Sequence, residues 1–255
     1  MKLVQIGNVK IGEGQPKIIV PMVGKTDKVL LDEAESIVGL QPDIVEWRVD
    51  KYEGVEQIDA VISLLESLKK VLIDIPILFT FRTIKEGGDC KINHSFYWTL
   101  LEAIAKTGQI ELIDVELFYD KKDIIKEFIE KAQRHNTKVV ISNHDFTKTP
   151  SNEELSFRLY QMEKLGADIL KIAVMPQSSR DVLNLMHITL SARENGVQQP
   201  MITMAMGQLG MISRFSGELF SSAATFAAGN QASAPGQVDI HSLRKGLNLL
   251  SWQSE

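Results

Sequence analysis

The sequence predicts an α/β fold, a (β/α)8 TIM barrel with an N-terminal β-hairpin that closes the barrel floor. Three observations favour this fold: eight short apolar runs recur along the 255 residues, amphipathic segments separate them, and no G-x-G-x-x-G motif follows the first run. Strands that alternate with helices form βαβ units around a parallel sheet, and eight units in about 250 residues is the size of such a barrel. An open doubly wound sheet is the alternative, and the missing glycine motif weighs against it.

The strands are expected where apolar runs are bounded by turn residues. The runs are Lys17–Val23, Asp43–Val49, Pro76–Arg82, Glu111–Leu117, Lys138–His144, Ile169–Val174, Pro200–Met206 and, less clearly, Ala223–Ala228. Helical periodicity between the runs predicts helices such as Ile58–Val71, Lys122–His135, Asn152–Leu165 and Arg180–Glu194. Ahead of the first run, Lys2–Lys10 has the pattern of a small hairpin with Gly7-Asn8 at its turn. No linker or low-complexity stretch divides the chain, so we expect one domain over residues 1–255.

The composition excludes several classes of protein. The chain is 44% hydrophobic and 24% charged, which is ordinary for a globular protein. A net charge of −5 without a basic block argues against a nucleic-acid partner. Cys90 is the single cysteine, which rules out a disulfide within the chain and a cysteine-based metal cluster. No signal-peptide pattern follows Met1, and Asp74 and Pro76 break the apolar run Val71–Phe81 well short of a membrane span, so we expect a cytoplasmic protein that does not enter a membrane.

Alternation along each strand predicts which side chains face the barrel interior. In the second run, Val45, Trp47 and Val49 must pack against helices, so Glu46 and Arg48 face inward. The same argument turns further polar residues inward in the next three runs, namely Thr80, Arg82, Asp114, Glu116, Ser142 and His144. These residues fall late in their strands, and the carboxyl ends of the strands carry the active site in barrels of this kind.

Lys171 is the residue that most strongly suggests catalysis. It lies within the apolar run Ile169–Val174, and burial there disfavours the ammonium form and favours a neutral amine, a nucleophile able to form a Schiff base. The alternative is a lysine at a strand end that extends its charged group to water. His144 lies at the end of the preceding strand, and a histidine can both take and return a proton near neutral pH. Together the two residues favour the catalytic interpretation.

Seven short motifs follow one another between Lys17 and Leu250. They are Val45–Asp50, Phe79–Arg82, Ile113–Glu116, Ser142–Phe146, Lys171–Pro176, Ile212–Arg214 and Ser233–Gln237. Together they resemble the type I 3-dehydroquinate dehydratases of the shikimate pathway. The resemblance implies a (β/α)8 lyase, a homodimer, that removes water from 3-dehydroquinate to give 3-dehydroshikimate with neither a metal nor an organic cofactor.

The resemblance also assigns roles to residues. Lys171 would condense with the C3 ketone, and His144 would act as a base on C2 and then as an acid toward the departing C1 hydroxyl. Glu86 would orient and tune the histidine, and Arg214 would bind the substrate carboxylate. Two methionines, Met204 and Met206, would pack against the ring of the substrate. The polar contacts to the ring oxygens would come from Glu46, Arg48, Arg82, Ser233 and Gln237. Pro21 and Ala205 depart from residues that are more usual in the family, a hydroxyl residue and a serine.

Two other functions share parts of this pattern. A class I aldolase also uses a lysine on the sixth strand, although the motifs around His144 and Ser233 favour the dehydratase. A catalytically silent barrel that binds a carboxylate metabolite would have lost the lysine or the histidine, and both are present. The glycines of Gly207–Gly210 could hold a phosphate, but the carboxylate implied for Arg214 is a better explanation of that region.

The other histidines are expected to be structural, and one segment near the C-terminus is expected to move. The other histidines, which lie away from the ends of the strands, are His94, His135, His187 and His241, and no H-x-H or H-E-x-x-H pattern suggests a metal site. The segment Gly229–Gln237 is small and polar, follows the eighth strand and is expected to form a lid over the barrel mouth.

Overall fold

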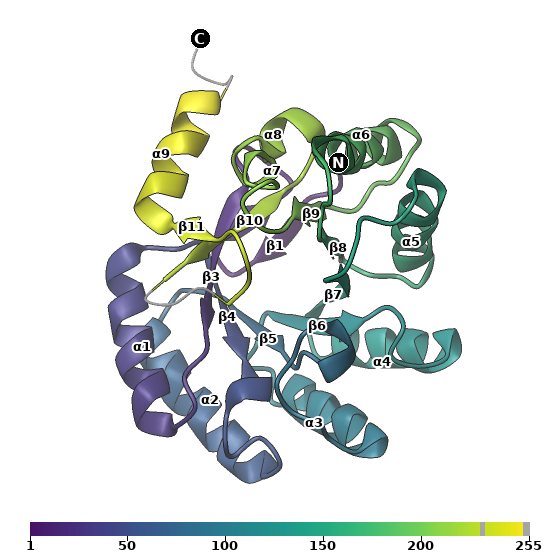
Figure 1. Cartoon of the computed structure of the whole chain (residues 1–255). Helices are drawn as coiled ribbons and strands as arrows, with labels where there is room; N and C mark the ends of the chain where they lie inside the picture. Colours follow the sequence, from purple (N-terminus) through teal and green to yellow (C-terminus); the bar gives the residue numbers. More distant parts are fainter. Residues whose placement is uncertain (230–232, 252–255) are drawn as a thin grey trace.

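The computed structural model of the chain describes residues 1–229 and 233–251. Its centre is a parallel sheet that curls into a barrel inside a ring of helices (Figure 1). The barrel strands are β3 (Lys17–Met22), β4 (Ile44–Arg48), β5 (Ile77–Thr80), β6 (Leu112–Glu116), β7 (Lys138–Asp145), β8 (Ile169–Val174), β9 (Met201–Ala205) and β10 (Ala224–Ala228). Each predicted run contains one of these strands, except that β7 extends one residue beyond its run, so the predicted barrel is confirmed.

The strands follow the chain around the barrel in the order β3 to β9, and β10 pairs with β3. Between β9 and β10 the ladder is reduced to one isolated parallel bridge, which joins Met201 to Ser222. The two-residue strand β11 (Val238–Asp239), which alternation did not predict, adds to β10 at Ala227 and Ala228. The barrel is therefore closed least tightly on the side where β9 meets β10.

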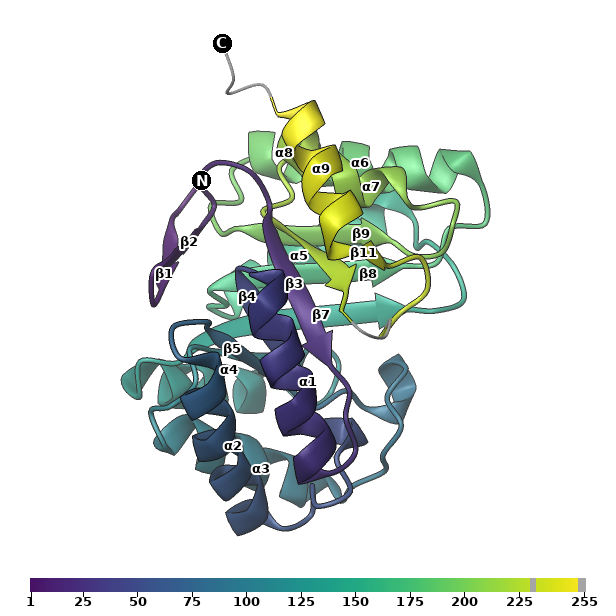
Figure 2. The same ribbon diagram turned by 90° about the vertical axis from the view of Figure 1, so that its left-hand side faces the viewer.

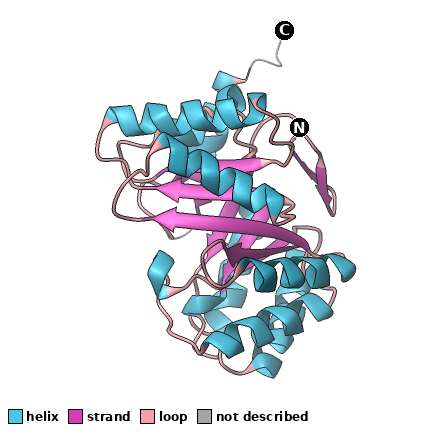
Figure 3. Ribbon diagram, turned by 90° about the vertical axis from the view of Figure 1, so that its right-hand side faces the viewer, coloured by secondary structure: helices cyan, strands magenta, loops and turns pink. Residues whose placement is uncertain are grey.

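Helices cover the outside of the barrel in the views of Figures 2 and 3. They are α1 (Asp27–Leu40), α2 (Ile58–Leu72), α3 (His94–Lys106), α4 (Lys122–Arg134), α5 (Asn152–Lys164), α6 (Ser179–Glu194), α9 (Ile240–Leu250), the short α7 (Ile212–Phe215) and α8 (Gly217–Phe220), and the 3-10 turns η1 (Val49–Lys51) and η2 (Ile84–Glu86). The four predicted helices are confirmed to within a residue at their starts. In the described part of the chain, no helix is both long and apolar enough to cross a membrane.

The two faces of the sheet differ as the alternation predicts. Trp47, Phe79 and Phe81 are buried in the large apolar cluster between the sheet and the helices. The inward face of the lower barrel forms a second apolar cluster, and the polar inward residues stand above it. One boundary differs from the expectation, because β5 ends at Thr80 and Arg82 follows it outside regular secondary structure.

The N-terminal hairpin closes the barrel floor. Strands β1 (Val4–Ile6) and β2 (Val9–Ile11) pair around Gly7, which adopts a positive φ of 54° at the turn. The inward side chains of the hairpin belong to the same apolar cluster as the lowest residues inside the barrel, and this cluster includes Val4, Ile6, Ile11, Ile44, Leu78, Leu112 and Val140. In Figure 2 the hairpin lies beside the starts of the strands and away from their arrowheads. The charged residues are therefore gathered at the opposite, carboxyl end.

Candidate active site

A cavity opens at the carboxyl ends of the strands. Its walls include every predicted site residue except Arg214, namely Glu46, Arg48, Arg82, Glu86, His144, Lys171, Met204, Met206, Ser233 and Gln237. Side chains that were not predicted as site residues complete the walls: Phe146, Ala173, Phe226 and Ala234. The cavity therefore combines one lysine, one histidine, two arginines and two glutamates with an apolar wall.

Lys171 extends from β8 into the cavity and is almost fully buried. Its neighbours along the strand, Leu170 and Ile172, pack on the helix side of the sheet, so they are not the surroundings of the amine. Instead, Nζ of Lys171 lies 3.3 Å from Oε1 of Glu46 and 3.3 Å from Oδ2 of Asp114. The ring of Phe226 faces the same nitrogen, 4.6 Å from Nζ to the ring centroid. Two carboxylates and an aromatic ring thus fix the position of the amine.

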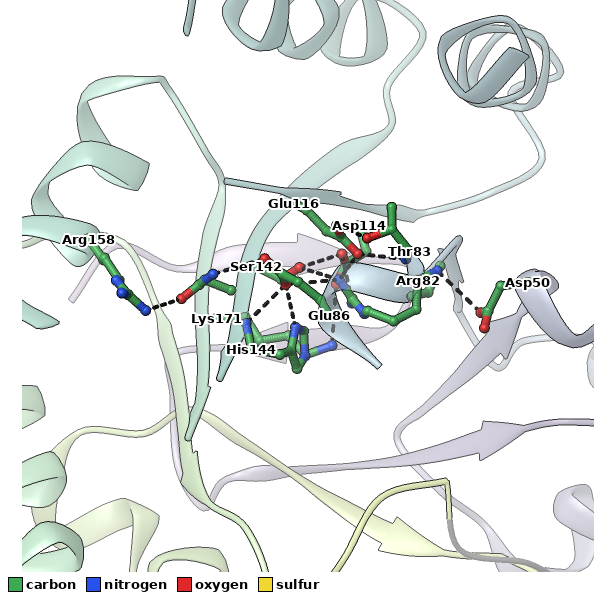
Figure 4. Close-up of polar contacts among 12 residues, drawn as sticks. Asp50, Arg82, Thr83, Glu86, Asp114, Glu116, Ser142, His144, Arg158 and Lys171 are labelled. Atoms are coloured by element: carbon green, nitrogen blue, oxygen red, sulfur yellow. Dashed lines mark hydrogen bonds and ion pairs between the residues drawn. The ribbon is translucent and has the colours of Figure 1, made fainter. Parts of the chain in front are cut away.

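His144 lies one strand away, on β7, where it pairs in register with Ala173 of β8. Oε2 of Glu86 lies 2.9 Å from Nδ1 of the imidazole and accepts a second hydrogen bond from the backbone N–H of the same histidine, also at 2.9 Å (Figure 4). Burial holds the pKa of His144 well below its usual range, and the charges of Arg82, Lys171 and Arg48 act in the same direction. A neutral imidazole that donates Nδ1–H to Glu86 presents the lone pair of Nε2 to the cavity.

Glu86 is the carboxylate behind the histidine, and it is the last residue of the 3-10 turn η2. Burial raises the pKa of Glu86 to about 8, and the charge of Glu116 acts in the same direction. The guanidinium of Arg82 and a hydrogen bond from Nδ2 of Asn143 to Oε1, 2.9 Å long, oppose this shift. The proton shared between His144 and Glu86 therefore depends on the groups that surround Glu86.

Arg82 is held within the protein by three carboxylates. Its guanidinium lies 2.9 Å from Asp114, 3.1 Å from Glu116 and 3.7 Å from Glu86. It also donates to Oγ of Ser142 at 2.9 Å. These carboxylates raise the pKa of Arg82 above its ordinary value despite complete burial. Arg82 is thus both a cavity residue and the counter-ion of the buried acids shown in Figure 4.

Arg48 is positioned by a carboxylate two residues further along the chain. Nε and Nη2 of Arg48 donate to the two oxygens of Asp50, each at 2.8 Å. The same carboxylate accepts the backbone N–H of Arg82 at 3.2 Å. Because Asp50 uses one edge of the guanidinium, Nη1 is the nitrogen left for a ligand.

Arg214, on α7, is fully buried just behind the cavity wall. It donates to the carbonyl oxygens of Phe226, at 3.4 Å, and Pro235, at 3.0 Å. Burial lowers the pKa of Arg214 to about 10. Among the described residues no carboxylate forms an ion pair with it, and its Nε is buried without a hydrogen-bond partner. A buried cation without an anion is a strong candidate for binding a carboxylate.

The predicted lid is described in part. Asn230 and Gln231 lie outside the described residues, whereas Ser233 and Gln237 line the cavity. Gln237 binds Ser233 through both amide atoms, at 2.8 Å to the backbone nitrogen and 3.1 Å to Oγ. The carbonyl of Pro235 accepts from Arg214 and from the backbone N–H of Gly207 at 3.1 Å. The segment therefore rests on Gly207 and on the arginine at the cavity.

The two departures from the family pattern lie in the sheet. Pro21 is a buried residue of β3, in register with Glu46. Ala205 belongs to the apolar cluster on the helix side, and its backbone N–H donates to Oγ of Ser213 at 3.0 Å. The position of Ala205 is consistent with a role in packing.

The remaining histidines do not reach the cavity. His94 binds Asp120 at 2.9 Å and stacks on Tyr119 at the start of α3, and the other three lie on the outer helices or at a helix end, all exposed: His135, His187 and His241. In residues 1–229 and 233–251, no group of three His, Cys, Asp or Glu side chains has an arrangement that could hold a metal ion.

Asp50 and Asp114 are the most important residues that the sequence-based list of sites omits. Both are buried, and each contacts a basic residue of the cavity. Alternation places Asp114 on the inward face of β6 and the motif around Arg48 contains Asp50, so both could have been found. Phe226 could not, because the eighth run is weakly patterned.

A profile of the family "Type I 3-dehydroquinase" matches residues 18–254. A 3-dehydroquinate dehydratase of Listeria welshimeri is 51% identical over 253 residues, which cover 99% of this chain and 100% of that protein. A 3-dehydroquinate dehydratase of Clostridium kluyveri is 47% identical over 249 residues and 98% of both chains.

Solved structures of 3-dehydroquinate dehydratases share the fold of this chain, and the following two are examples. The type I 3-dehydroquinate dehydratase of Clostridium difficile, with covalently modified comenic acid, superposes with a TM-score of 0.94 at 47% identity and covers 98% of this chain and 97% of its own. The 3-dehydroquinate dehydratase of Geobacillus kaustophilus gives a TM-score of 0.95 at 41% identity and covers 100% of this chain and 98% of its own.

Proposed function

We infer the reaction of this chain from its family, because the chain belongs to the type I 3-dehydroquinases. It is a hydro-lyase of the shikimate pathway that removes one molecule of water from 3-dehydroquinate to give 3-dehydroshikimate. The observation that carries the assignment of its residues is that Lys171 and His144, on neighbouring strands, line one cavity with a buried carboxylate behind the histidine.

Lys171 is proposed as the nucleophile. Its Nζ, once neutral, adds to the C3 carbonyl carbon of the substrate, and loss of water from the carbinolamine leaves an iminium ion. The iminium is a better electron sink than the ketone, so it lowers the free energy needed to break the C2–H bond. Glu46 and Asp114, both 3.3 Å from Nζ, support this role because they hold the amine in place within the cavity.

His144 is proposed as the acid–base group. Nε2 takes the proton from C2, the electrons of the C–H bond move into the iminium to form an enamine, and the protonated imidazole then gives its proton to the leaving C1 hydroxyl. Hydrolysis of the resulting imine releases the product and restores Lys171. The lowered pKa of His144 supports the first step, because it keeps the imidazole neutral and ready to accept a proton.

The remaining site residues are proposed to hold the substrate. Arg214 binds the carboxylate, which supplies the anion that this buried guanidinium lacks among the described residues. Met204 and Met206 supply the apolar wall against the ring, and the polar contacts to ring oxygens come from Glu46, Arg48, Arg82, Ser233 and Gln237. The imine supplies the electron sink, so the proposed steps need no metal or organic cofactor.

Borohydride trapping tests the proposal. Incubation with 3-dehydroquinate and borohydride should add one ligand mass to the intact protein, and peptide mapping should place it on Lys171. A Lys171→Met variant, which has no amine at this position, should gain no mass and show no turnover. Dehydration also makes a conjugated enone whose absorbance an aldol cleavage would not produce. Modification of another lysine, or the absence of modification, would reject Lys171 as the nucleophile.

The family resemblance also supports a homodimer, a single barrel domain over residues 1–255 and a cytoplasmic location. Sedimentation equilibrium of the purified protein tests the dimer, because a mass near that of one 28.5 kDa chain would reject it. A single cooperative unfolding transition is the result expected for one domain. Cell fractionation tests the location.

A further inference from the structure

The carboxylate of Glu86 is connected to a helix outside the barrel through one side chain. Asn143 follows Ser142 on β7 and is buried. Its Nδ2 donates to Oε1 of Glu86 at 2.9 Å, and its Oδ1 accepts from Nη1 of Arg158 at 2.5 Å. Arg158 belongs to α5, and Figure 4 shows it at one end of the chain of contacts that leads to Glu86 and His144.

Arg158 is itself fixed in place. Its Nε donates to Glu154, one turn earlier in the same helix, at 2.8 Å, and its guanidinium lies 5.5 Å from the ring centroid of Phe118. Only 14% of its side chain is exposed. The guanidinium therefore presents Nη1 to Asn143 with little freedom to turn away.

The chemistry of the two groups fixes the orientation of the amide. A guanidinium has only donors, so the oxygen of Asn143 must face Arg158 and the NH2 group must face Glu86. An ionised Glu86 accepts that hydrogen bond. A protonated Glu86 accepts it more weakly through its carbonyl oxygen, and its new O–H needs an acceptor, which Asn143 could offer only if its amide turned over and pointed its NH2 group at the guanidinium.

We propose that Arg158 is a positioning residue for the dehydratase reaction: by holding Asn143 as a donor toward Glu86, it selects the ionised form of Glu86 that His144 needs. The inference rests on the proposed function, because it assigns Arg158 a role in the same proton transfer. The other charged groups that face Glu86 are Arg82, Glu116, Asp114 and His144, and those that face Arg158 are Glu154 and, more distantly, Asp145. None of the acids in this set can replace the donor that Asn143 supplies.

The pH profile of kcat/KM tests the inference. Arg158→Met removes the donor and keeps an apolar chain of similar length. Asn143 can then turn over and stabilise protonated Glu86, so the acid limb should move to higher pH by roughly one unit, while the rate on the alkaline plateau changes little. Arg158→Lys keeps a group that can only donate hydrogen bonds. The acid limb of its kcat/KM profile should therefore lie at nearly the same pH as in the unchanged protein. Arg193→Met is the matched control, because Arg193 of α6 is also half-buried but binds the carbonyls of Val197 and Gln199.

Asn143→Asp provides a second measurement if Arg158→Met fails to fold. The new carboxylate keeps a partner for Arg158 but places a negative charge against Glu86, so the acid limb should move to still higher pH. The role of Arg158 would be overturned if the acid limb of the kcat/KM profile stayed at the same pH in the folded variants. It would also be overturned if the rate fell at every pH while the acid limb did not move. Failure of the unchanged protein to dehydrate 3-dehydroquinate or to be trapped on Lys171 would reject the proposed function instead, whatever the variants do.

Discussion

One oxygen atom of Glu86, Oε2, contacts both the backbone nitrogen and the imidazole Nδ1 of His144, each at 2.9 Å. The backbone contact fixes the carboxylate relative to β7, and the ring contact then fixes the imidazole relative to the carboxylate. Rotation of the ring would break the second bond, so Nε2 remains directed at the cavity without the need for a third residue. The geometry makes Glu86 a positioning residue for His144.

Replacement of His144 should slow dehydration but leave the first covalent step possible. In His144→Ala the Lys171 amine and its carboxylate neighbours are unchanged, so borohydride should still trap the substrate. Loss of a positioned acid–base group typically costs about 10²- to 10⁴-fold in rate, and we expect kcat to fall by at least that factor. Single-turnover kinetics with product absorbance gives the measurement. Near-normal turnover would remove His144 from the mechanism.

Replacement of Glu86 should alter the pH dependence more than substrate binding. Glu86→Gln removes the charge that stabilises the imidazolium, while burial continues to disfavour it. The pKa of His144 should fall further, and the acid limb that ionisation of Glu86 sets in the unchanged protein, the limb that Arg158→Met moves to higher pH, should be lost from the kcat/KM profile. A tenfold rise in KM with an unmoved limb would instead make Glu86 a substrate contact.

Replacement of Arg214 should weaken binding of the carboxylate. A hydrogen bond to a charged group contributes about 1.5–3 kcal/mol, so Arg214→Met should raise KM by roughly 10- to 150-fold. Arg214→Lys should recover part of the loss because it keeps the charge but not the paired donors. Inhibition by a substrate analogue that lacks the carboxylate should be unaffected in both variants. An unchanged KM in Arg214→Met would show that the carboxylate binds elsewhere.

The segment that includes Ser233 and Gln237 should close on the substrate. The two side chains now bind each other, so a ligand that contacts both must replace their mutual hydrogen bonds. We expect the amide hydrogens of residues 233–237 to exchange more slowly when the site is filled, and Gln237→Ala to raise KM. A ligand-bound crystal structure in which both side chains face bulk solvent would reject the lid.

The barrel could be predicted because its signals are local. Each apolar run has the length of one strand, and alternation within β4 was enough to turn Glu46 and Arg48 inward and Trp47 outward. The same alternation places Asp114 inside, although its contact with Lys171 depends on how far β6 and β8 are staggered around the barrel. A pattern within one strand contains no information on that distance.

Other parts of the site depend on contacts between segments distant in the chain. Lys171 has apolar neighbours in sequence but two carboxylates beside it in space, because successive side chains of a strand point to opposite faces. The contacts of Arg214 with Pro235 and of Arg158 with Asn143 both depend on how a helix packs against another segment, and periodicity within one element does not fix that packing. Strand β11 was not predicted because a strand of two residues is too short to show alternation.

The hairpin at the floor has a consequence for the order of events in turnover. Below Lys171 the interior is filled by apolar side chains, and Val4, Ile6 and Ile11 cap it from beneath. In the part of the chain that the structure describes, the route to Lys171 therefore starts at the opposite end of the barrel. Substrate enters through the mouth of the barrel at that end, and the released water and the product leave through the same opening. The first molecule must depart before the next can bind, so high product concentrations should compete with substrate for a single entrance.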